Sequence, residues 1–308
     1  MSKFVLYRLL QFPLILAIIY LVTFMLVWVA PGDPLDQPDR NLDDATKQAL
    51  REQFHADSAM GFLTYYPWRL LTAGDFGPSM ANPDWSVNEI LFASLPVSIA
   101  LGLFAVMIAL VVGVAVGTLA AVERGGVFDW LSLTLALVGI SVPSFVVASL
   151  LLSIFAVKLG WFGVGSWGAI SDLVLPGLAL ALLPMAYIAR LTRVAMIDVL
   201  SSDYVRTARA KGLTRSSVIW KHCLRNAFLP VLSYLGPAAA VTLTGSFVVE
   251  AVFNVPGLGQ HFVNSVANRD RTLILGVVLV YGAMVLLFNL LVDLAYAWVD
   301  PRIEVGAG

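Results

Sequence analysis

The chain has 308 residues, of which 59% are hydrophobic and 13% are charged, and its formal net charge is −1. Soluble domains carry about 25% charged residues, so this composition indicates a membrane protein. The near-zero net charge excludes a globally basic nucleic-acid binder, and the single cysteine, Cys223, excludes an intramolecular disulfide and a cysteine-based metal cluster.

Six stretches are apolar over the roughly 20 residues that a helix needs to cross a bilayer. In chain order these predicted spans are Leu9–Ala30, Leu95–Val122, Leu131–Val157, Leu173–Leu191, Leu229–Phe253 and Thr272–Val299. The first is too long for the apolar region of a signal peptide, so we interpret it as a retained span. The fourth contains Pro176 and Pro184, which neighbouring helices can accommodate in a membrane.

Basic residues near the span ends predict the orientation, because they gather on the cytoplasmic side. Most of them lie in Met1–Arg8, Glu123–Asp129, Arg190–Arg225 and Pro301–Gly308. The segment Pro31–Ser94, on the other side, holds ten acidic and four basic residues. We therefore expect both termini in the cytoplasm.

This topology divides the chain into four parts. They are an N-terminal segment with the first span (1–30), a periplasmic cap (31–94), a five-helix core (95–299) that includes a cytoplasmic loop (192–228), and a cytoplasmic tail (300–308). The cap contains one helix signal, LDDATKQALREQF, with Asp43 or Asp44 as its N-cap. In the second span, Gly113 and Gly117 form a GxxxG pattern that lets another helix approach closely.

Motifs for bond chemistry are absent from the sequence. There is no phosphate-binding GxxxxGK[ST] loop, and no HExxH, CxxC or GxSxG pattern. Ionisable residues inside the predicted spans are almost limited to Asp293, with Glu250 near the outer end of the fifth span, and acids at such depths are functional candidates. We therefore expect a conduit with no catalytic residue, cofactor or metal of its own.

Positive charge is concentrated in one loop, where eight of the nineteen Lys and Arg residues lie between Arg190 and Arg225. One interpretation is a topology signal that contacts lipid headgroups. A helical projection opposes it, because Arg206 and Arg209 lie on one side and Lys211 lies nearly opposite, which leaves no single basic face.

A row of small and flat residues offers another interpretation of this loop. Tyr204, Ala208 and Gly212 follow one another at a spacing of four, which suits insertion into a protein groove. Gly212 is expected to end the helix and Thr214 to cap a second one. The pattern predicts a short docking helix over Tyr204–Leu213.

Two phrases of this loop, YVRTARAKG from Tyr204 and HCLRNAFLP from His222, resemble the EAA loop of the inner-membrane permeases of ABC importers. The resemblance continues along the chain and is to the first permease type of the dipeptide, oligopeptide and nickel branch. It rests on APGDP from Ala30, GDFG from Gly74, PSF from Pro143, VEAVF from Val249, PGLG from Pro256 and NLLVD from Asn289. Arg206 replaces the glutamate of the general EAA motif, as fits the peptide branch.

The resemblance implies the type I ABC importer permease fold, an all-α integral membrane protein with six transmembrane helices, in the bacterial inner membrane. It implies four kinds of partner: a second homologous permease, two ABC ATPase subunits, a periplasmic or lipid-anchored substrate-binding protein, and membrane lipid. Di- or oligopeptides would be the substrate, while nickel, haem or another small solute stays an alternative. An ion-coupled secondary transporter is a more distant alternative function. Such a transporter would show inverted repeats and several intramembrane acids, which are not evident in the sequence.

The resemblance also assigns roles to residues. ATPase coupling falls to Tyr204, Val205, Arg206, Thr207, Ala208, Arg209, Ala210, Lys211, Gly212 and Leu213. The candidates for the transport pathway or its gate are Ser141, Pro143, Ser144, Glu250, Asn289 and Asp293. Because an unpaired acid inside a span is costly, we expect Asp293 to pair with Arg190 or Arg193, where the fourth span ends.

Overall fold

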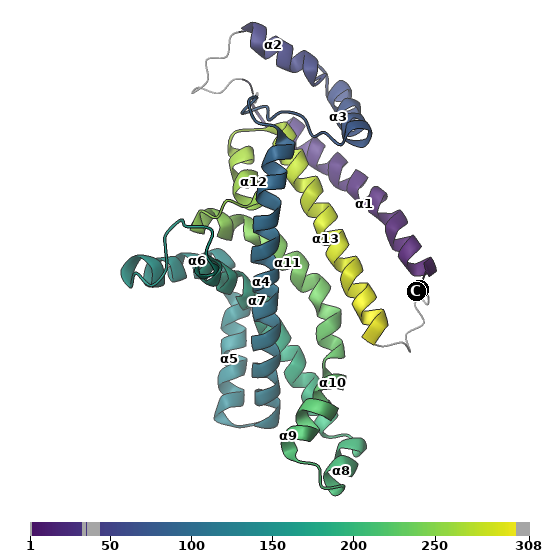
Figure 1. The fold of residues 1–308 in the computed structure, drawn as a ribbon, viewed down its shortest axis with the longest axis vertical. Coiled ribbons are helices and arrows are strands. Elements are labelled where there is room, and N and C mark those ends of the chain that lie inside the picture. Colours follow the sequence, from purple (N-terminus) through teal and green to yellow (C-terminus); the bar gives the residue numbers. More distant parts are fainter. Residues whose placement is uncertain (1, 33–34, 36–43, 300–308) are drawn as a thin grey trace. The chain divides into compact units, whose positions relative to one another are not determined.

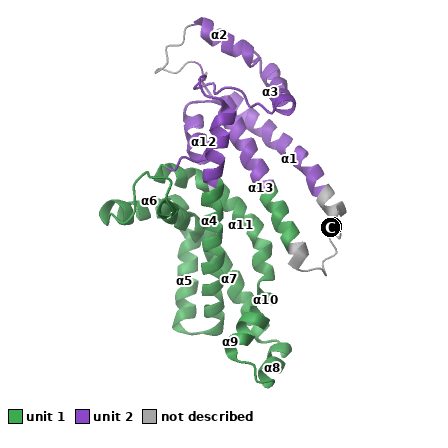
Figure 2. Cartoon of the chain, viewed as in Figure 1, with its two compact units in different colours: residues 1–4, 99–254, 287–308 green, residues 5–98, 255–286 purple. Residues whose placement is uncertain are grey.

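The computed structural model describes residues 2–32, 35 and 44–299, and this part of the chain is helical apart from loops and one isolated β-bridge between Pro78 and Ser86 (Figure 1). The helices form two compact units, each assembled from separate stretches of sequence (Figure 2). Residues 99–254 and 287–299 make up most of the first unit, and residues 5–98 and 255–286 belong to the second. The predicted tail at 300–308 lies outside the described residues.

The second unit contains α1 (Ser2–Val29) from Val5 onward, α2 (Asp44–Gln53), α3 (Ala59–Ala73) and α12 (Leu258–Ala267), with the first parts of α4 (Val87–Val122) and α13 (Arg271–Val299). Its core is aromatic, and it includes Tyr20, Phe24, Phe54, Phe62 and Tyr66. The two buried tyrosines donate hydrogen bonds to backbone carbonyls, Tyr20 to Leu63 and Tyr66 to Thr272, both at 3.0 Å. The expected helix α2 is confirmed.

Helix α3 lies where the sequence predicts only an ordered cap. It begins at Ser58, whose Oγ accepts a hydrogen bond from the amide of Gly61 at 3.0 Å, and it ends at Gly74, which has a φ of +64°. The next residue, Asp75, accepts hydrogen bonds from Nε of Arg69 at 3.0 Å and from the amide of Gly77 at 2.8 Å. Burial raises the pKa of Asp75, but the Gly77 amide and the Arg69 guanidinium outweigh it and hold the pKa below its ordinary value.

A buried carboxylate joins the loop before α4 to the start of α13. Asp270 is 1% exposed and accepts hydrogen bonds from the Ser79 hydroxyl and from the amides of Met80 at 3.2 Å and Ala81 at 3.3 Å. It also accepts one from the amide of Leu273 at 3.0 Å, which caps α13. The loop is thereby held to the first turn of that helix.

The first unit is built around α7 (Ile170–Leu200), which packs against α5 (Val127–Ser141), α6 (Ser144–Leu151) and α11 (Leu229–Phe253). The expected close approach at the GxxxG pattern is confirmed, because α4 also packs on α7. A Cβ at Gly113 would lie 2.9 Å from the carbonyl oxygen of Met185, and one at Gly117 only 2.3 Å from that of Ala189. No side chain larger than hydrogen fits at these two positions without a shift.

Within the part of the chain that the structure describes, four helices are long and apolar enough to cross a membrane: Tyr7–Val29, Val87–Val122, Ile170–Leu200 and Arg271–Ala295. Two bent helix pairs, Val127–Ser141 with Ser144–Lys158 and Arg215–Ala227 with Leu229–Leu243, raise the number to six if each pair forms one span. Helix α11 has the bounds predicted for the fifth span. Pro176 and Pro184 are accommodated inside α7, where both are buried.

The third predicted span, Leu131–Val157, is wrong as a single straight helix. The chain bends by 103° between α5 and the following pair, α6 and the π-helix η1 (Leu152–Lys158). The cause is Pro143, because the residue before a proline is driven out of the helical region. Val142 accordingly has φ −91° and ψ 123°, and α6 begins directly after the proline.

Candidate functional site

The predicted docking helix exists as α8 (Asp203–Ala210), and both of its expected boundary signals are confirmed. Gly212 has a φ of +81°, and its amide donates to the carbonyl of Arg209 at 2.9 Å, which ends the helix. Thr214 caps α9 (Arg215–Ser217), accepting a hydrogen bond from the amide of Ser217 at 3.3 Å. The short π-helix η2 (Val218–Cys223) and α10 (Leu224–Ala227) then lead into α11.

The row of Tyr204, Ala208 and Gly212 does not form the free face of α8, so this expectation was wrong. Val205 is fully buried and Ala208 is 8% exposed, and both belong to a core cluster of this unit. The other buried members of that cluster are Ala121, Met196, Val218, Cys223 and Ala227. The apolar side of α8 is therefore used to hold the helix against the end of α7 and the segment that precedes α11.

Tyr204 is 42% exposed and its hydroxyl accepts a hydrogen bond from Nδ2 of Asn226 in α10 at 2.9 Å. The remaining exposed side chains of α8 and the turn after it include three basic residues and one acidic residue: Asp203, Arg206, Thr207, Arg209, Ala210, Lys211 and Leu213. Arg206 contacts Asp203 at 3.4 Å with both side chains in water, an ion pair of little energetic weight. This surface is charged, rigidly held and accessible, so it can contact an acidic or polar surface of another protein.

An ion pair that the sequence analysis did not foresee lies close to this region. Arg193 of α7 donates from Nε to Oδ1 of Asp129 at 2.5 Å and from Nη2 to Oδ2 at 2.8 Å. The Asp129 side chain is 5% exposed and also accepts a hydrogen bond from the amide of Gly125 at 2.9 Å. The pair fixes the start of α5 to α7, three residues before the buried Met196.

Arg193 was one of the two expected partners of Asp293, and two of its N–H groups, on Nε and Nη2, are bound to Asp129. On α7, Arg193 faces α5, and the pairing of Asp293 with an arginine stays a prediction. A signal for Asp129 was present in the sequence, since it is the acid in the first turn of an otherwise apolar helix.

The pathway candidates lie at three separate places in this unit. Ser141 and Pro143 are exposed and Ser144 is half-buried at the bend between α5 and α6, and Ser141 Oγ donates to the carbonyl of Leu137 at 2.8 Å. Glu250 is fully buried in the last turn of α11.

The third place pairs α13 with α11. A Cβ at Gly236 would lie 2.7 Å from Oδ1 of Asn289, so the asparagine packs directly on the glycine backbone. Asp293 is half-buried one turn further along α13. Glu250 follows Gly236 by fourteen residues of α11, about 21 Å along the helix, so Glu250 and Asn289 do not form one cluster.

In residues 2–32, 35 and 44–299, no three His, Cys, Asp or Glu side chains are grouped so that they could hold a metal ion. Cys223 is a buried member of the cluster beneath α8. The arrangement as a whole defines a helical membrane protein with a protruding basic segment anchored on its central helices.

Comparison with known proteins agrees with this class. Residues 113–305 match the family described as "Binding-protein-dependent transport system inner membrane component", and the chain belongs to this family. Over 305 residues, 99% of each chain, it is 41% identical to the dipeptide transport system permease protein DppB of Bacillus subtilis. It is 42% identical over 306 residues to the oligopeptide transport system permease protein OppB of Escherichia coli K12, covering 99% of this chain and all of the relative.

Solved structures show the same fold at lower sequence similarity. An inward-facing structure of the MetNI methionine ABC transporter aligns with a TM-score of 0.58 and 19% identity over 68% of this chain and 96% of that chain. An amino acid ABC transporter aligns with a TM-score of 0.53 and 21% identity, over 68% and 94% of the respective chains. The protein is thus an inner-membrane transport component with the fold of an ABC transporter permease.

Proposed function

We propose that this chain is the first of two permease subunits in an ABC importer of di- or oligopeptides. The observation that carries the proposal is the match of about two-fifths identity, over nearly the whole chain, to permeases of dipeptide and oligopeptide transport. The exposed Arg206 and Arg209 of α8 support the coupling role, because they offer a partner charged groups on a firmly anchored helix.

The proposed topology has six spans, with each bent helix pair counted as one span and both termini in the cytoplasm. Two observations support it: the two bent pairs are apolar enough to complete a set of six, and basic residues gather at one set of span ends. This topology places α8 in the cytoplasm and α2, α3 and α12 in the periplasm.

The proposed partners follow from this arrangement. Two ATPase subunits dock at the cytoplasmic helices, one of them at α8, and a second permease completes the pathway. A periplasmic or lipid-anchored binding protein delivers the substrate to the acidic periplasmic side. The chain itself hydrolyses no ATP.

Coupling is proposed to pass through the cluster beneath α8. Val205 and Ala208 pack with Met196 of α7 and with Cys223 and Ala227, which precede α11. Because packed interiors transmit displacement rather than absorb it, movement of α8 by an ATPase shifts the ends of α7 and α11 together. These are the two helices that pack most extensively on each other in this unit.

The pathway candidates keep their proposed role. Ser141, Pro143 and Ser144 lie at the only bend of more than 100° between paired apolar helices in the described chain, where backbone groups are accessible. Glu250, Asn289 and Asp293 place polar atoms inside otherwise apolar helices. Nickel, haem or another small solute stays an alternative cargo, and uptake measurements separate it from peptide.

Charge reversal tests the coupling surface. The double variant Arg206→Glu and Arg209→Glu should reduce recovery of the ATPase subunits with the tagged full chain by about tenfold, because a complementary charge is replaced by a repulsive one. Lys158→Glu serves as the matched control, since Lys158 is exposed at the end of η1 and far along the sequence from α8. Undiminished recovery and ATP turnover in the double variant would show that α8 is not the docking element.

A further inference from the structure

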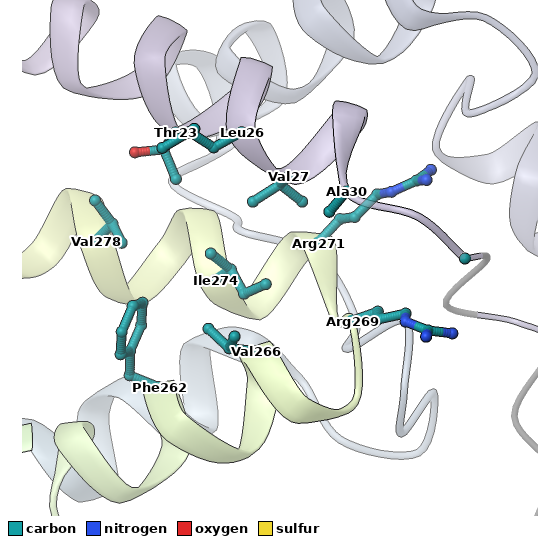
Figure 3. A pocket seen from close by; sticks show the side chains of 11 residues that line it. Thr23, Leu26, Val27, Ala30, Phe262, Val266, Arg269, Arg271, Ile274 and Val278 are labelled. Carbon is teal, nitrogen blue, oxygen red and sulfur yellow. The ribbon is translucent and has the colours of Figure 1, made fainter. Parts of the chain in front are cut away.

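A cleft of about 320 Å³ lies among α1, α12 and α13, within one compact unit (Figure 3). Its volume is within the range typical of ligand sites and is about ten times the volume that one molecule occupies in liquid water. The walls are apolar and consist mainly of Leu26 and Val27 of α1, Phe262 and Val266 of α12, and Ile274 and Val278 of α13. Such a space favours hydrocarbon over water.

Two arginines stand at one end of this cleft, Arg269 and Arg271, and Thr23 and Val278 lie toward the other (Figure 3). Arg269 adopts a φ of +57°, and its guanidinium packs against Gly32, where a Cβ would lie 2.2 Å from Nη1. The guanidinium carbon of Arg271 lies 4.5 Å from the centre of the Trp28 ring. Both positive groups are therefore held at the mouth by backbone and ring contacts.

Among the described residues that line the cleft, the two charged side chains, Arg269 and Arg271, are both positive, and none is acidic. Planar guanidinium groups bind phosphate through paired hydrogen bonds. An anionic group attached to an apolar chain fits both the mouth and the walls.

The position along the membrane-spanning helices agrees with this chemistry. The apolar stretch of α1 ends at Val29, one residue after Trp28, and the apolar stretch of α13 begins at Arg271. Tryptophan and arginine at span ends lie at the level of lipid headgroups, while the cleft extends from there along the apolar parts of both helices.

We propose that this cleft is a binding site for an anionic phospholipid. One acyl chain occupies the space between Leu26, Phe262 and Val278, and the phosphate is bound by Arg269 and Arg271. Gly32 is required because its lack of a side chain leaves room for the Arg269 guanidinium. The lipid thereby fills the space between α1 and the α12–α13 pair.

The test uses the full chain, with whatever subunits co-purify, in nanodiscs of phosphatidylcholine that contain phosphatidylglycerol with a photoreactive acyl chain. Labelled peptides are identified by mass spectrometry. Labelling of α1, α12 and α13 should fall about tenfold in the double variant Arg269→Gln and Arg271→Gln, since charge-assisted hydrogen bonds are lost. Val266→Trp should reduce it similarly by filling the cleft.

Matched controls separate the site from general effects. Val263→Trp changes the same helix at an exposed valine outside the cleft, and Arg124→Gln removes an exposed arginine elsewhere; both should label like the unaltered protein. A photoreactive phosphatidylcholine should label weakly, and added inorganic phosphate should not compete, which distinguishes a lipid from a free anion. The measurement involves no transport, so its result is independent of the proposed cargo.

Three results would overturn the proposal. Equal labelling in the Val266→Trp and Val263→Trp variants would show that the cleft holds no acyl chain. Loss of labelling on adding inorganic phosphate would assign the arginines to a free anion. A photoreactive amino acid at position 266 that links to another protein chain instead of lipid would identify the cleft as a subunit interface.

Discussion

Asp129 and Arg193 form the charged contact that fixes the start of α5 to α7, which leads into α8. Both oxygens of the carboxylate are bound, one by Nε and the other by Nη2 and the Gly125 amide. Removing one partner leaves the other charge unpaired at a mostly apolar helix surface. The resulting loss in the free energy of unfolding exceeds the loss from breaking an ion pair at an exposed surface.

We predict that Arg193→Gln lowers the free energy of unfolding by about 2 kcal/mol. Exchanging the two residues, Asp129→Arg with Arg193→Asp, should restore part of the loss. Unfolding of the purified chain in SDS titrations measures both. Arg206→Gln is the control, because its ion pair with Asp203 is exposed. If Arg193→Gln lowers the free energy of unfolding no more than Arg206→Gln does, the ion pair between Asp129 and Arg193 does not stabilise the fold.

The depressed pKa of Asp75 predicts that the stability of the folded chain depends on pH. Its pKa is depressed in the folded chain, so the stabilisation is fully present above the ordinary pKa of about 3.9 and is lost as the pH falls through the folded value. Asp75→Asn lacks this contribution. The difference in stability between the original chain and this variant should therefore shrink below about pH 4.

Thermal unfolding, measured at pH values from neutral down to about pH 3, gives this difference in stability between the original chain and Asp75→Asn. Asp84→Asn provides the comparison, because Asp84 is an exposed aspartate of the same region. A gap between the original chain and Asp75→Asn that stays constant to the lowest pH would contradict the assigned role of the Arg69 and Gly77 contacts.

At the scale of elements, α7 organises its unit because α4, α5, α6, α10 and α11 all pack on it. On one side it is approached by α4 through Gly113 and Gly117, and on others by α5, α6 and α11. The glycines permit contact between backbones, which side chains would prevent. Substitutions at these contacts therefore disturb the packing of α7, the helix that leads directly into α8.

We predict that Gly117→Ala destabilises the chain by about 1–3 kcal/mol, because the added carbon would lie 2.3 Å from a backbone oxygen that cannot move alone. Gly139→Ala is the matched control: it lies on α5 and also faces α7, but its nearest neighbours are 3.3 Å away. SDS titration of both variants gives the comparison. Equal stability of the two would show that α4 and α7 are less closely packed than described.

Much of the element order could be predicted from the sequence, because long apolar runs and cap residues act locally. The spans over α1, α4, α7, α11 and α13, the stop at Gly212 and the cap at Thr214 are of this kind. Helices α3 and α12 were missed, since each is short and lies among Gly, Pro and aromatic residues that are typical of loops.

Contacts between distant residues could not be predicted in the same way. The partner of Arg193 depends on which side of α7 faces α5, and the burial of Ala208 depends on the cluster formed with Met196 and Cys223. A helical projection shows which residues share a face, but it does not show which face is covered. The position of helix α8 was thus predicted correctly, while the side of the helix that is buried was not.

At the scale of the whole molecule, the family, the fold and the anchored basic helix together support a permease driven by separate ATPases. The chain contains no phosphate-binding loop, and we propose that partner ATPase subunits supply the energy for transport. Specificity for peptides rests on the similarity to dipeptide and oligopeptide permeases. The direct question is whether the assembled complex moves peptide.

The decisive measurement is uptake of a radiolabelled dipeptide or oligopeptide into proteoliposomes that contain the chain with its co-purified permease and ATPases, ATP inside, and the binding protein outside. The account predicts uptake that requires ATP and the binding protein, and that is lost in the Arg206→Glu and Arg209→Glu variant but kept in Lys158→Glu. ATP-dependent uptake of a metal ion or haem with no uptake of any peptide would contradict it.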